Sequence, residues 1–333
     1  KIIMESDGDI TCALDYDSTW TPTDSATSTA AIYDDNAWHH IACVKSGATS
    51  LSLYIDGVLI ATDSSLTVTN TLTNSDPIYF GVDADAASND FTGSLDNIKI
   101  YTTARTPAQI AWEYNRGAPI GWWKLDENTG TIANDSMGNS TAGTLTNSPT
   151  WATGKFNQAI SFTGTNQHVL IADDPDFDFA DDEDLTLTTW FKHSAASAQE
   201  IIMSKYNEAG YKIIMESDGD ITCALDYDST WSPTDSATST LATYDDGNWH
   251  HITCVKTGAT SLNLYIDGVL ITTDSSITAT NTLTNTDPIY LGIDADGTTL
   301  DFTGSLDDVR IYRYPLTTQQ IKTVMNNASA VRY

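Results

Sequence analysis

Three carboxylates in the second half of the chain have a spacing that could support hydrolysis of a glycosidic bond. Glu216, Asp218 and Asp220 lie two residues apart in "MESDGDI", and residues two apart on a strand project from the same face. Two such groups held about 5–5.5 Å apart are the arrangement of a retaining glycosidase. However, Asp218-Gly219 is a turn dipeptide, and a turn there would break the alternation. We therefore interpret the stretch as a hairpin turn and expect no enzyme activity; a glycoside hydrolase is a remote alternative.

Acidic loops offer two candidate calcium sites. The stretch "DADGTTLD" places three carboxylates and a glycine within eight residues, and calcium prefers six to eight oxygen ligands from flexible acidic loops. A second candidate joins the "NDSMGN" turn to the end of the chain, because the first and last strands of a two-sheet sandwich often lie side by side. The first group is Asp294, Asp296 and Asp301, with Asp83, Asp85 and Asp90 at the matching positions of an earlier "DADAASND", and the second is Asp135 with Asp307. The alternative is that these are solvated acidic turns.

A long polar loop carries the best candidate for binding a sugar. The loop "DYDSTWSPTDSATSTLATYDDGN" joins two expected strands and holds Trp231 together with Tyr227, Asp226 and Asp228. An exposed indole beside carboxylates can stack on a sugar ring while the acids accept hydrogen bonds from its hydroxyl groups. The alternative is that Trp231 folds back as a lid on the core.

The chain repeats itself. A shift of 211 positions aligns Lys1–Tyr101 with Lys212–Tyr312, and about four in five residues are identical. The second copy is preceded by residues 118–211, which have no counterpart ahead of Lys1. We therefore expect residues 1–117 to be the second half of a domain and residues 118–333 to be a complete one. Lys1 is then either a cut within a longer array or the start of a half-domain that strands from another chain complete.

The charge of the chain excludes some partners. Asp and Glu number 45 against 15 Lys and Arg, a net charge of −30, which argues against nucleic acid and anionic membranes. No apolar stretch approaches the roughly 20 residues of a membrane-spanning helix. The densest acidic run, Ala172–Asp184, is interpreted as a solvated loop.

The four cysteines are two cysteines duplicated, Cys12 and Cys43 in one copy and Cys223 and Cys254 in the other. If their strands form an antiparallel pair with Asp228 near Trp249, each pair lies opposite and can form a cross-strand disulfide. Such a bond suits an extracellular protein. The alternative is two buried free thiols on the inner face.

Short strands account for most of the chain. Runs rich in Thr, Ile, Val, Leu and aromatic residues are bounded by Gly, Asp, Asn and Pro, the signature of an all-β sandwich. In "LNLYIDG", Leu262, Leu264 and Ile266 should face one way, and Asp267-Gly268 should form a tight hairpin. Only two helices are expected, at Arg105–Gly117 and Leu316–Asn327, one after each copy.

Five segments in order resemble a LamG-like jelly-roll domain of the concanavalin A-like lectin/glucanase superfamily. They are "GWWKLDENTGTIANDSMGN", "GKFNQAISFTGTNQHVLI", "DLTLTTWFKH", "NWHHITCVKTGATSLNLYIDGVLI" and "FTGSLDDVRIY", followed by "PLTTQQI". The resemblance spans Gly121–Asn327, and Lys1–Asn115 resemble the second half of the domain. It implies two antiparallel sheets packed face to face, and binding or adhesion more often than catalysis.

Two functions follow from these features. Near-identical copies on a short linker favour a non-catalytic structural or adhesive module, outside the cell or at its surface, whose partners are neighbouring copies. The alternative is a carbohydrate-binding module with Trp231 exposed among acids, whose partners are glycans.

Overall fold

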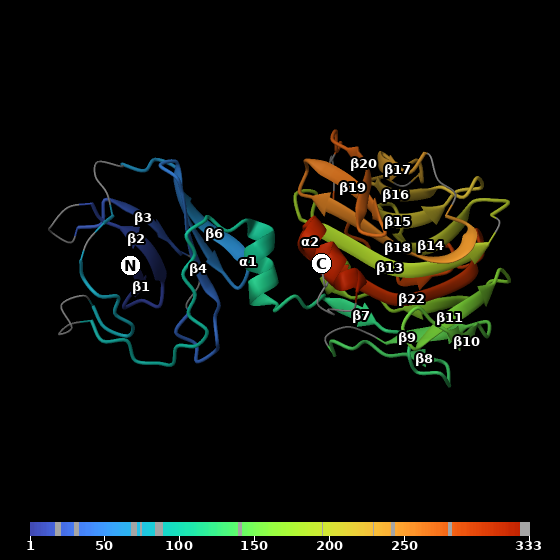
Figure 1. Cartoon of the computed structure of the whole chain (residues 1–333), viewed down its shortest axis with the longest axis horizontal. Coiled ribbons are helices and arrows are strands. Elements are labelled where there is room, and N and C mark those ends of the chain that lie inside the picture. Colours follow the sequence, from blue (N-terminus) through green and yellow to red (C-terminus); the bar gives the residue numbers. More distant parts are fainter. Residues whose placement is uncertain are drawn as a thin grey trace. The chain divides into compact units, whose positions relative to one another are not determined.

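The computed structural model of the chain describes residues 1–16, 21–29, 33–67, 72–73, 75–83, 89–138, 142–194, 196–228, 230–240, 244–278 and 282–326. The chain divides into two compact units, residues 1–117 (unit 1) and residues 118–333 (unit 2) (Figure 1). Among the described residues, no helix is long and apolar enough to span a membrane.

Unit 1 contains two three-stranded antiparallel sheets. The first has the order β1 (Ile2–Met4), β2 (Ile10–Leu14) and β3 (Asp24–Thr27), and the second β4 (Ile41–Ser46), β5 (Ser50–Ile55) and β6 (Val58–Asp63). Apolar side chains from both sheets meet in one small core. That core contains Ile10, Cys12, Ala26, Leu51, Leu53 and Ile55.

Unit 2 contains two eight-stranded antiparallel sheets. The first sheet has the order β10 (Thr150–Thr153), β11 (Gln158–Thr163), β22 (Thr303–Tyr312), β13 (Leu185–Ser194), β18 (Asp246–Thr257), β19 (Ser261–Ile266) and β20 (Val269–Asp274), and β7 (Gly121–Trp123) also pairs with β22. The second has the order β17 (Asp235–Thr238), β16 (Ile221–Asp226), β15 (Gly210–Met215), β14 (Glu200–Tyr206), β21 (Ile289–Leu291), β12 (His168–Ile171), β9 (Gly143–Thr146) and β8 (Ile132–Ala133). A short 3₁₀ helix, η1, spans Pro175–Phe177. The expected jelly-roll sandwich is confirmed.

The core of unit 2 lies between its two sheets. Alternate residues point into it, because successive side chains of a strand point to opposite faces. In β19, Leu262, Leu264 and Ile266 are buried as expected, and in β15 Tyr211 and Ile213 belong to the same core. Lys212, between them, therefore projects from the outer face of the second sheet.

Each copy ends in one short helix, as expected. The helix α1 (Pro107–Tyr114) begins after the cap Thr106, and α2 (Thr318–Met325) begins after Thr317; both have a capping box with Gln at the third position. Each helix contacts the Asp-Gly hairpin of its own unit, where Gly57 lies against Tyr114 and Gly268 lies against Lys322. The two residues of each hairpin have positive φ, the type I′ geometry that Asp-Gly favours.

Disulfides join Cys12 to Cys43 and Cys223 to Cys254, with Cα atoms 5.9 and 5.8 Å apart. The cross-strand geometry expected for them is wrong. Cys223 lies on β16 of the second sheet and Cys254 on β18 of the first, so the bond crosses the sandwich. The reason is β17, which lies within the stretch interpreted as a loop and pairs with β16 before the chain crosses to the other sheet.

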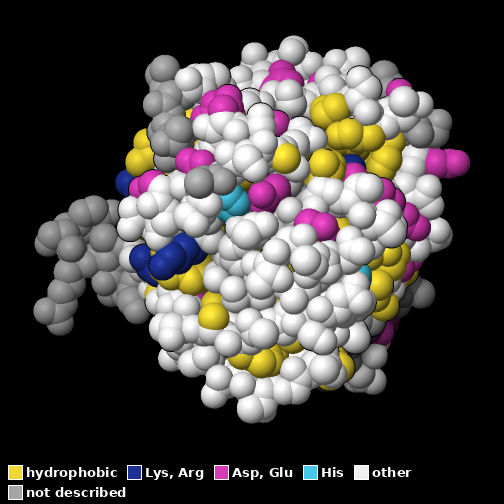
Figure 2. Space-filling model, turned by 90° about the vertical axis from the view of Figure 1, so that its right-hand side faces the viewer, with side chains coloured by type: hydrophobic (Ala, Val, Ile, Leu, Met, Phe, Trp, Pro, Cys, Tyr) yellow, Lys and Arg dark blue, Asp and Glu magenta, His cyan; other side chains and the backbone are white. Residues whose placement is uncertain are grey.

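On the face of the molecule in Figure 2, acidic side chains form no single continuous patch. They are scattered among polar surface, and Lys and Arg side chains are few.

Removing the disulfide of unit 2 should weaken that unit. Replacing Cys223 and Cys254 together by Ala should lower its free energy of unfolding by about 3 kcal/mol, because the cross-link restricts the unfolded chain. Urea unfolding followed by tryptophan fluorescence measures the effect. The Cys12→Ala/Cys43→Ala variant is the matched control and should leave the transition of unit 2 in place. The prediction would be contradicted if adding reductant left the urea midpoint of the natural protein unchanged.

Candidate functional site

A cleft of about 430 Å³ opens on the outer face of the second sheet of unit 2. Its walls come from the end of β14 and the hairpin that follows, from β15, from the loop between β16 and β17, and from the segments on either side of β21. The lining residues are Tyr206, Asn207, Glu208, Lys212, Trp231, Asp287, Asp294, Ala295 and Asp296.

Aromatic rings form one wall of the cleft. Trp231 meets Tyr206 edge to face, with ring centroids 4.8 Å apart. The Lys212 Nζ lies 3.8 Å from the Trp231 centroid and 4.8 Å from that of Tyr206, so the ammonium is held between two rings. Trp231 is half-buried and also packs on an outer-face cluster that includes Ile214 and Ala224. The sequence left open whether Trp231 is a platform or a lid; here it covers this small cluster and also lines the cleft.

A buried ion pair crosses the floor of the cleft. Lys212 Nζ lies 2.6 Å from Asp294 Oδ1, and only 2% of the lysine side chain is exposed. Burial lowers the pKa of the Lys212 ammonium, and Asp294 opposes that shift. The Asp294 carboxylate also accepts hydrogen bonds from the Ser204 hydroxyl and the Ala295 N–H. In unit 1 the matching residues, Lys1 and Asp83, form the same ion pair.

Tyr206 is held in place by a hydrogen bond, and its surroundings raise the pKa of its hydroxyl group. Its hydroxyl donates to the carbonyl of Asp228 at 2.9 Å, which ties β14 to the loop of Trp231. Burial, followed by the nearby carboxylates of Asp226 and Asp228, raises the pKa of Tyr206 to about 12. The phenol is therefore neutral at physiological pH and presents a hydroxyl group.

Of the four residues expected to bind a sugar, only Trp231 lines the cleft. Tyr227 is buried in the core of unit 2. Asp226 is fully buried and accepts hydrogen bonds from the N–H groups of Tyr227 and Ser232, so it shapes the loop. The Asp228 side chain caps the N–H of Thr230. In unit 1, the counterpart of Trp231 lies outside the described residues.

The lining residues that the sequence did not indicate are Tyr206, Asn207, Glu208, Lys212, Asp287 and Ala295. A lysine between two apolar residues, as in "YKII", was the available signal, since a charged residue within a buried strand must have a partner.

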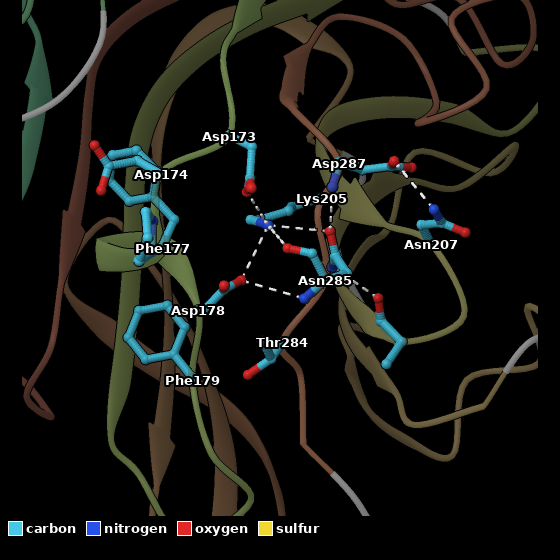
Figure 3. A network of polar contacts seen from close by, with 12 residues as sticks. Asp173, Asp174, Phe177, Asp178, Phe179, Lys205, Asn207, Thr284, Asn285 and Asp287 are labelled. Carbon is cyan, nitrogen blue, oxygen red and sulfur yellow. Dashed lines mark hydrogen bonds and ion pairs between the residues drawn. The ribbon is translucent and has the colours of Figure 1, made fainter.

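A buried ammonium beneath the cleft positions its rim (Figure 3). Lys205 is completely buried, and its Nζ donates to Asp173 Oδ1 at 2.9 Å and to the carbonyl and side-chain oxygens of Asn285 at 2.8 and 3.0 Å. Asp178 Oδ1 lies 3.1 Å away. Asn285 in turn accepts from the N–H of Asp287. Lys205 thus holds the segment that carries one wall of the cleft.

The same network fixes the opposite rim. Asn285 Nδ2 donates to the carbonyl of Ala209, and Asn207 Nδ2 donates to Asp287 Oδ1 at 3.1 Å. Figure 3 shows the Asn207 and Asp287 side chains pointing toward one another beside the network. The hairpin after β14 and the segment before β21 are therefore held together.

The acidic run Ala172–Asp184 is not simply a solvated loop. Besides Lys205, Lys256 Nζ donates to the carbonyls of Asp181 and Glu183, both at 2.7 Å. Arg313 donates to the Glu183 carboxylate and to carbonyls that include that of Asp178. Three cations from strands or their ends therefore attach this run to the sandwich.

The first group expected to bind calcium is largely occupied by contacts within the protein. Besides Asp294, Asp296 accepts from the N–H groups of Thr298 and Thr299, and Asp301 accepts from the N–H of Asn166. In unit 1, Asp83 pairs with Lys1 and accepts from Asn89, Asp90 is exposed, and Asp85 lies outside the described residues.

The second candidate calcium site assumed that the first and last strands of the sandwich lie side by side, and β7 does pair with β22. Asp135 Oδ1 accepts from the N–H groups of Trp122 and Met137, whereas Asp307 Oδ2 accepts from the N–H of Phe156. Within the described ranges, no group of three or more Asp, Glu, His or Cys residues could hold a metal ion. Calcium binding stays a prediction, checked by the melting temperature with and without EDTA.

The three carboxylates with glycosidase-like spacing lie at a turn. Asp218 caps the N–H of Asp220, Asp220 accepts from the Ser239 hydroxyl, and Glu216 accepts from Thr222. Gly219 has a φ of +86°, as a tight turn requires. The alternation is broken there as expected, so the three side chains do not share one strand face.

Asp307 is fully buried, and its Oδ1 has no hydrogen-bond partner among the described residues. Burial raises its pKa to about 8, and the Asp308 and Asp126 carboxylates add to the shift. The folded state therefore keeps the carboxyl protonated at physiological pH.

Replacing Asp307 by Asn should remove a loss of stability at high pH. An unfolded Asp ionises near pH 3.9, whereas the folded protein holds this proton to about pH 8, so this carboxyl destabilises the fold increasingly as pH rises through that window. The midpoint of thermal unfolding of Asp307→Asn should exceed that of the natural protein more at pH 8 than at about pH 5. Asp301→Asn, with an equal change of charge, is the control. An equal difference at both pH values would contradict the assignment.

Two solved structures with TM-scores above 0.5 share this fold, and a third, with a lower score, serves for comparison only. The binding domain of Paraclostridial Mosquitocidal Protein 1 matches with a TM-score of 0.53 at 16% identity, covering 63% of this chain and 52% of that one. The ligand-binding domain of botulinum neurotoxin serotype D, in complex with N-acetylneuraminic acid, gives 0.51 at 16% identity, with 63% and 51% covered. Domain 4 of an extracellular arabinanase from Geobacillus stearothermophilus, in complex with arabinotriose, gives 0.45 at 18% identity, with 62% and 98% covered.

The chain spans about half the length of the first two of these structures, and at such identities the likeness extends to the fold alone. No curated protein matches the chain. A family model described as the concanavalin A-like lectin/glucanases superfamily matches residues 2–111 and 163–322. The chain therefore belongs to the concanavalin A-like lectin/glucanase superfamily.

Proposed function

We propose that unit 2 is a non-catalytic carbohydrate-binding module and that the cleft beside Trp231 holds the sugar. The observation that carries the proposal is the combination of an aromatic wall with amide and carboxylate groups in one open cleft of about 430 Å³. A sugar ring offers an apolar face to stack on Trp231 and hydroxyl groups for the polar rim. Asn207 and Asp287, joined at 3.1 Å, supply both a donor and an acceptor at that rim.

The charge of the cleft favours neutral glycans. Glu208, Asp287, Asp294 and Asp296 line it, and Lys212, the one cation among the lining residues, is already paired with Asp294. An anionic sugar would meet uncompensated carboxylates, and like charges repel. The serotype D neurotoxin domain was solved with the anionic N-acetylneuraminic acid, and this chain should differ from it in that preference.

Binding without catalysis is supported by the state of the acids. Glu216 accepts a hydrogen bond from Thr222 on β16, Asp218 accepts one from Asp220 within the turn, and Asp220 accepts one from Ser239 beside β17. Asp294 and Asp296 are held by an ion pair and by backbone N–H groups. None of these arrangements offers a free acid opposite a nucleophilic carboxylate across the cleft.

A structural or adhesive role within a tandem array is the second candidate function. It is favoured by a disulfide and a lysine–aspartate ion pair that recur at equivalent positions in both units. The disulfides also support a place outside the cell or at its surface. The two functions are compatible, because an adhesive array can use sugar-binding modules.

Removing the aromatic wall should weaken sugar binding. Trp231→Ala should raise the Kd for a bound neutral oligosaccharide about tenfold, because stacking and the contact area of the indole are lost. The probes are immobilised neutral oligosaccharides and their sialylated counterparts, followed by calorimetry with the tightest neutral binder.

Trp38→Ala is the matched control for this experiment, since that indole is 69% exposed and belongs to unit 1. Its Kd should equal that of the natural protein. Failure to bind any oligosaccharide, or a Trp231→Ala variant that binds as well as the natural protein, would refute the proposed site. A preference for the sialylated probes would refute the argument from charge.

A further inference from the structure

Unit 1 exposes apolar side chains whose counterparts in unit 2 are buried. Ile78 is 67% exposed and Ile289 is 0% exposed; the values are 53% and 0% for Leu95 and Leu306, and 70% and 0% for Ile100 and Ile311. We call these residues, with their like neighbours, the open face of unit 1. It consists of Ile78, Phe80, Phe91, Leu95, Ile98 and Ile100, each at least 38% exposed.

The sequence of this face does not explain its exposure. Four of the six residues are identical in the two copies, and Phe80 and Ile98 become Leu291 and Val309. A local contact is also kept, because the N–H of Phe91 donates to Gly81 as that of Phe302 does to Gly292. Yet the counterparts in unit 2 lie in or beside β21 and β22, whereas the described residues between β6 and α1 form no strand.

The difference lies in what covers the face. In unit 2, β21 pairs with β12 and β14, and β22 pairs with β11, β13 and β7. All five flanking strands come from residues 118–211. In unit 2, the sequence and the register of the segment that covers this face, residues 118–211, are therefore known.

We propose that the open face of unit 1 is a docking surface for a first-half segment of this same repeat, with the strand pattern of residues 118–211. Docking would convert the exposed stretch into two strands, as in β21 and β22. It would bury the six apolar side chains and pair backbone groups that now lack ladder partners.

The geometry of unit 2 favours supply from the same polypeptide, ahead of β1. There the segment runs into the second half through the short hairpin between β14 and β15, whose paired ends are Tyr206 and Gly210. A second copy of this chain is a poorer source, because its residues 118–211 already fill the core of its own unit 2.

The experiment compares two chains by hydrogen exchange. One is the chain of residues 1–333, and the other carries an added copy of residues 118–211 directly ahead of Lys1, which recreates the junction between Tyr211 and Lys212. In the first, the amides of residues 91–101 other than that of Phe91, which is bonded to Gly81, should exchange rapidly, while those of residues 302–312 are protected. In the extended chain, exchange of residues 91–101 should slow by about a hundredfold or more.

A matched control carries Phe162→Asp and Leu187→Asp in the added copy only. These residues lie on the strands that flank β22, so this extension should not protect residues 91–101. An intact extension that leaves their exchange unchanged would overturn the proposal. Protection of residues 91–101 in the unextended chain would also overturn the proposal. If that chain were a dimer by light scattering, a second copy would cover the face. If it were a monomer, residues 118–211 would alternate between the two units.

A second pair of variants tests the face without any extension. In the unextended chain, Ile100→Asp should leave the unfolding midpoint unchanged, because the side chain is exposed, whereas Ile311→Asp should destabilise unit 2. In the extended chain, Ile100→Asp should abolish the new protection. A loss of stability from Ile100→Asp in the unextended chain would show that the face is already covered. The proposal that unit 2 binds a sugar does not depend on any of these outcomes.

Discussion

The pairing of β22 is the constraint on which the sandwich depends. This last strand of the repeat does not lie at an edge, because β11, β13 and β7 bond to its two sides and Leu306, Val309 and Ile311 point into the core. A strand can occupy such a place only when the neighbours that satisfy its backbone groups are present. The first half of the repeat supplies all three neighbours, so the second half alone cannot form the sheet. That dependence accounts for the different structures of two nearly identical second halves, residues 1–101 and residues 212–312.

Buried ammonium groups are the second organising feature of this acidic protein. Lys205 and Lys256 donate to carboxylates and carbonyls of the run Ala172–Asp184, and Lys212 pairs with Asp294. A buried ammonium is costly unless each of its protons finds an acceptor, and acidic loops are rich in acceptors. Burial lowers the pKa values of Lys212 and Lys256, and the carboxylates around them oppose the shift. These three lysines thus attach acidic loops to the sheets.

The sequence predicted the fold better than the site, and particular residues show why. Alternation in β19 and the Asp-Gly turn are local properties, and both were predicted. The sequence predicted that Cys223 could bond to Cys254, but it placed both on neighbouring strands of one sheet. The alternation of apolar residues is the same in both sheets, so it does not reveal where the chain crosses from one sheet to the other. Tyr206 and Lys212 belong to one hairpin, but Asp287 lies far from them in the chain, and only the order of the strands brings all three into one cleft. Trp231 could be predicted because a tryptophan within a polar loop is visible in the local sequence alone.

The proposed site and the closure of the fold are physically connected. Unit 1 keeps the lysine–aspartate ion pair of the cleft, with Lys1 and Asp83 in place of Lys212 and Asp294. Tyr206 and Asn207, which complete the aromatic wall and the rim, precede β15 and therefore belong to the first half of the repeat. The ammonium that fixes the rim, Lys205, comes from that half too. A repeat can therefore form the cleft only where it also has the strands that bury β22, and a docked first half would bring unit 1 both a closed sandwich and the missing wall of a sugar site.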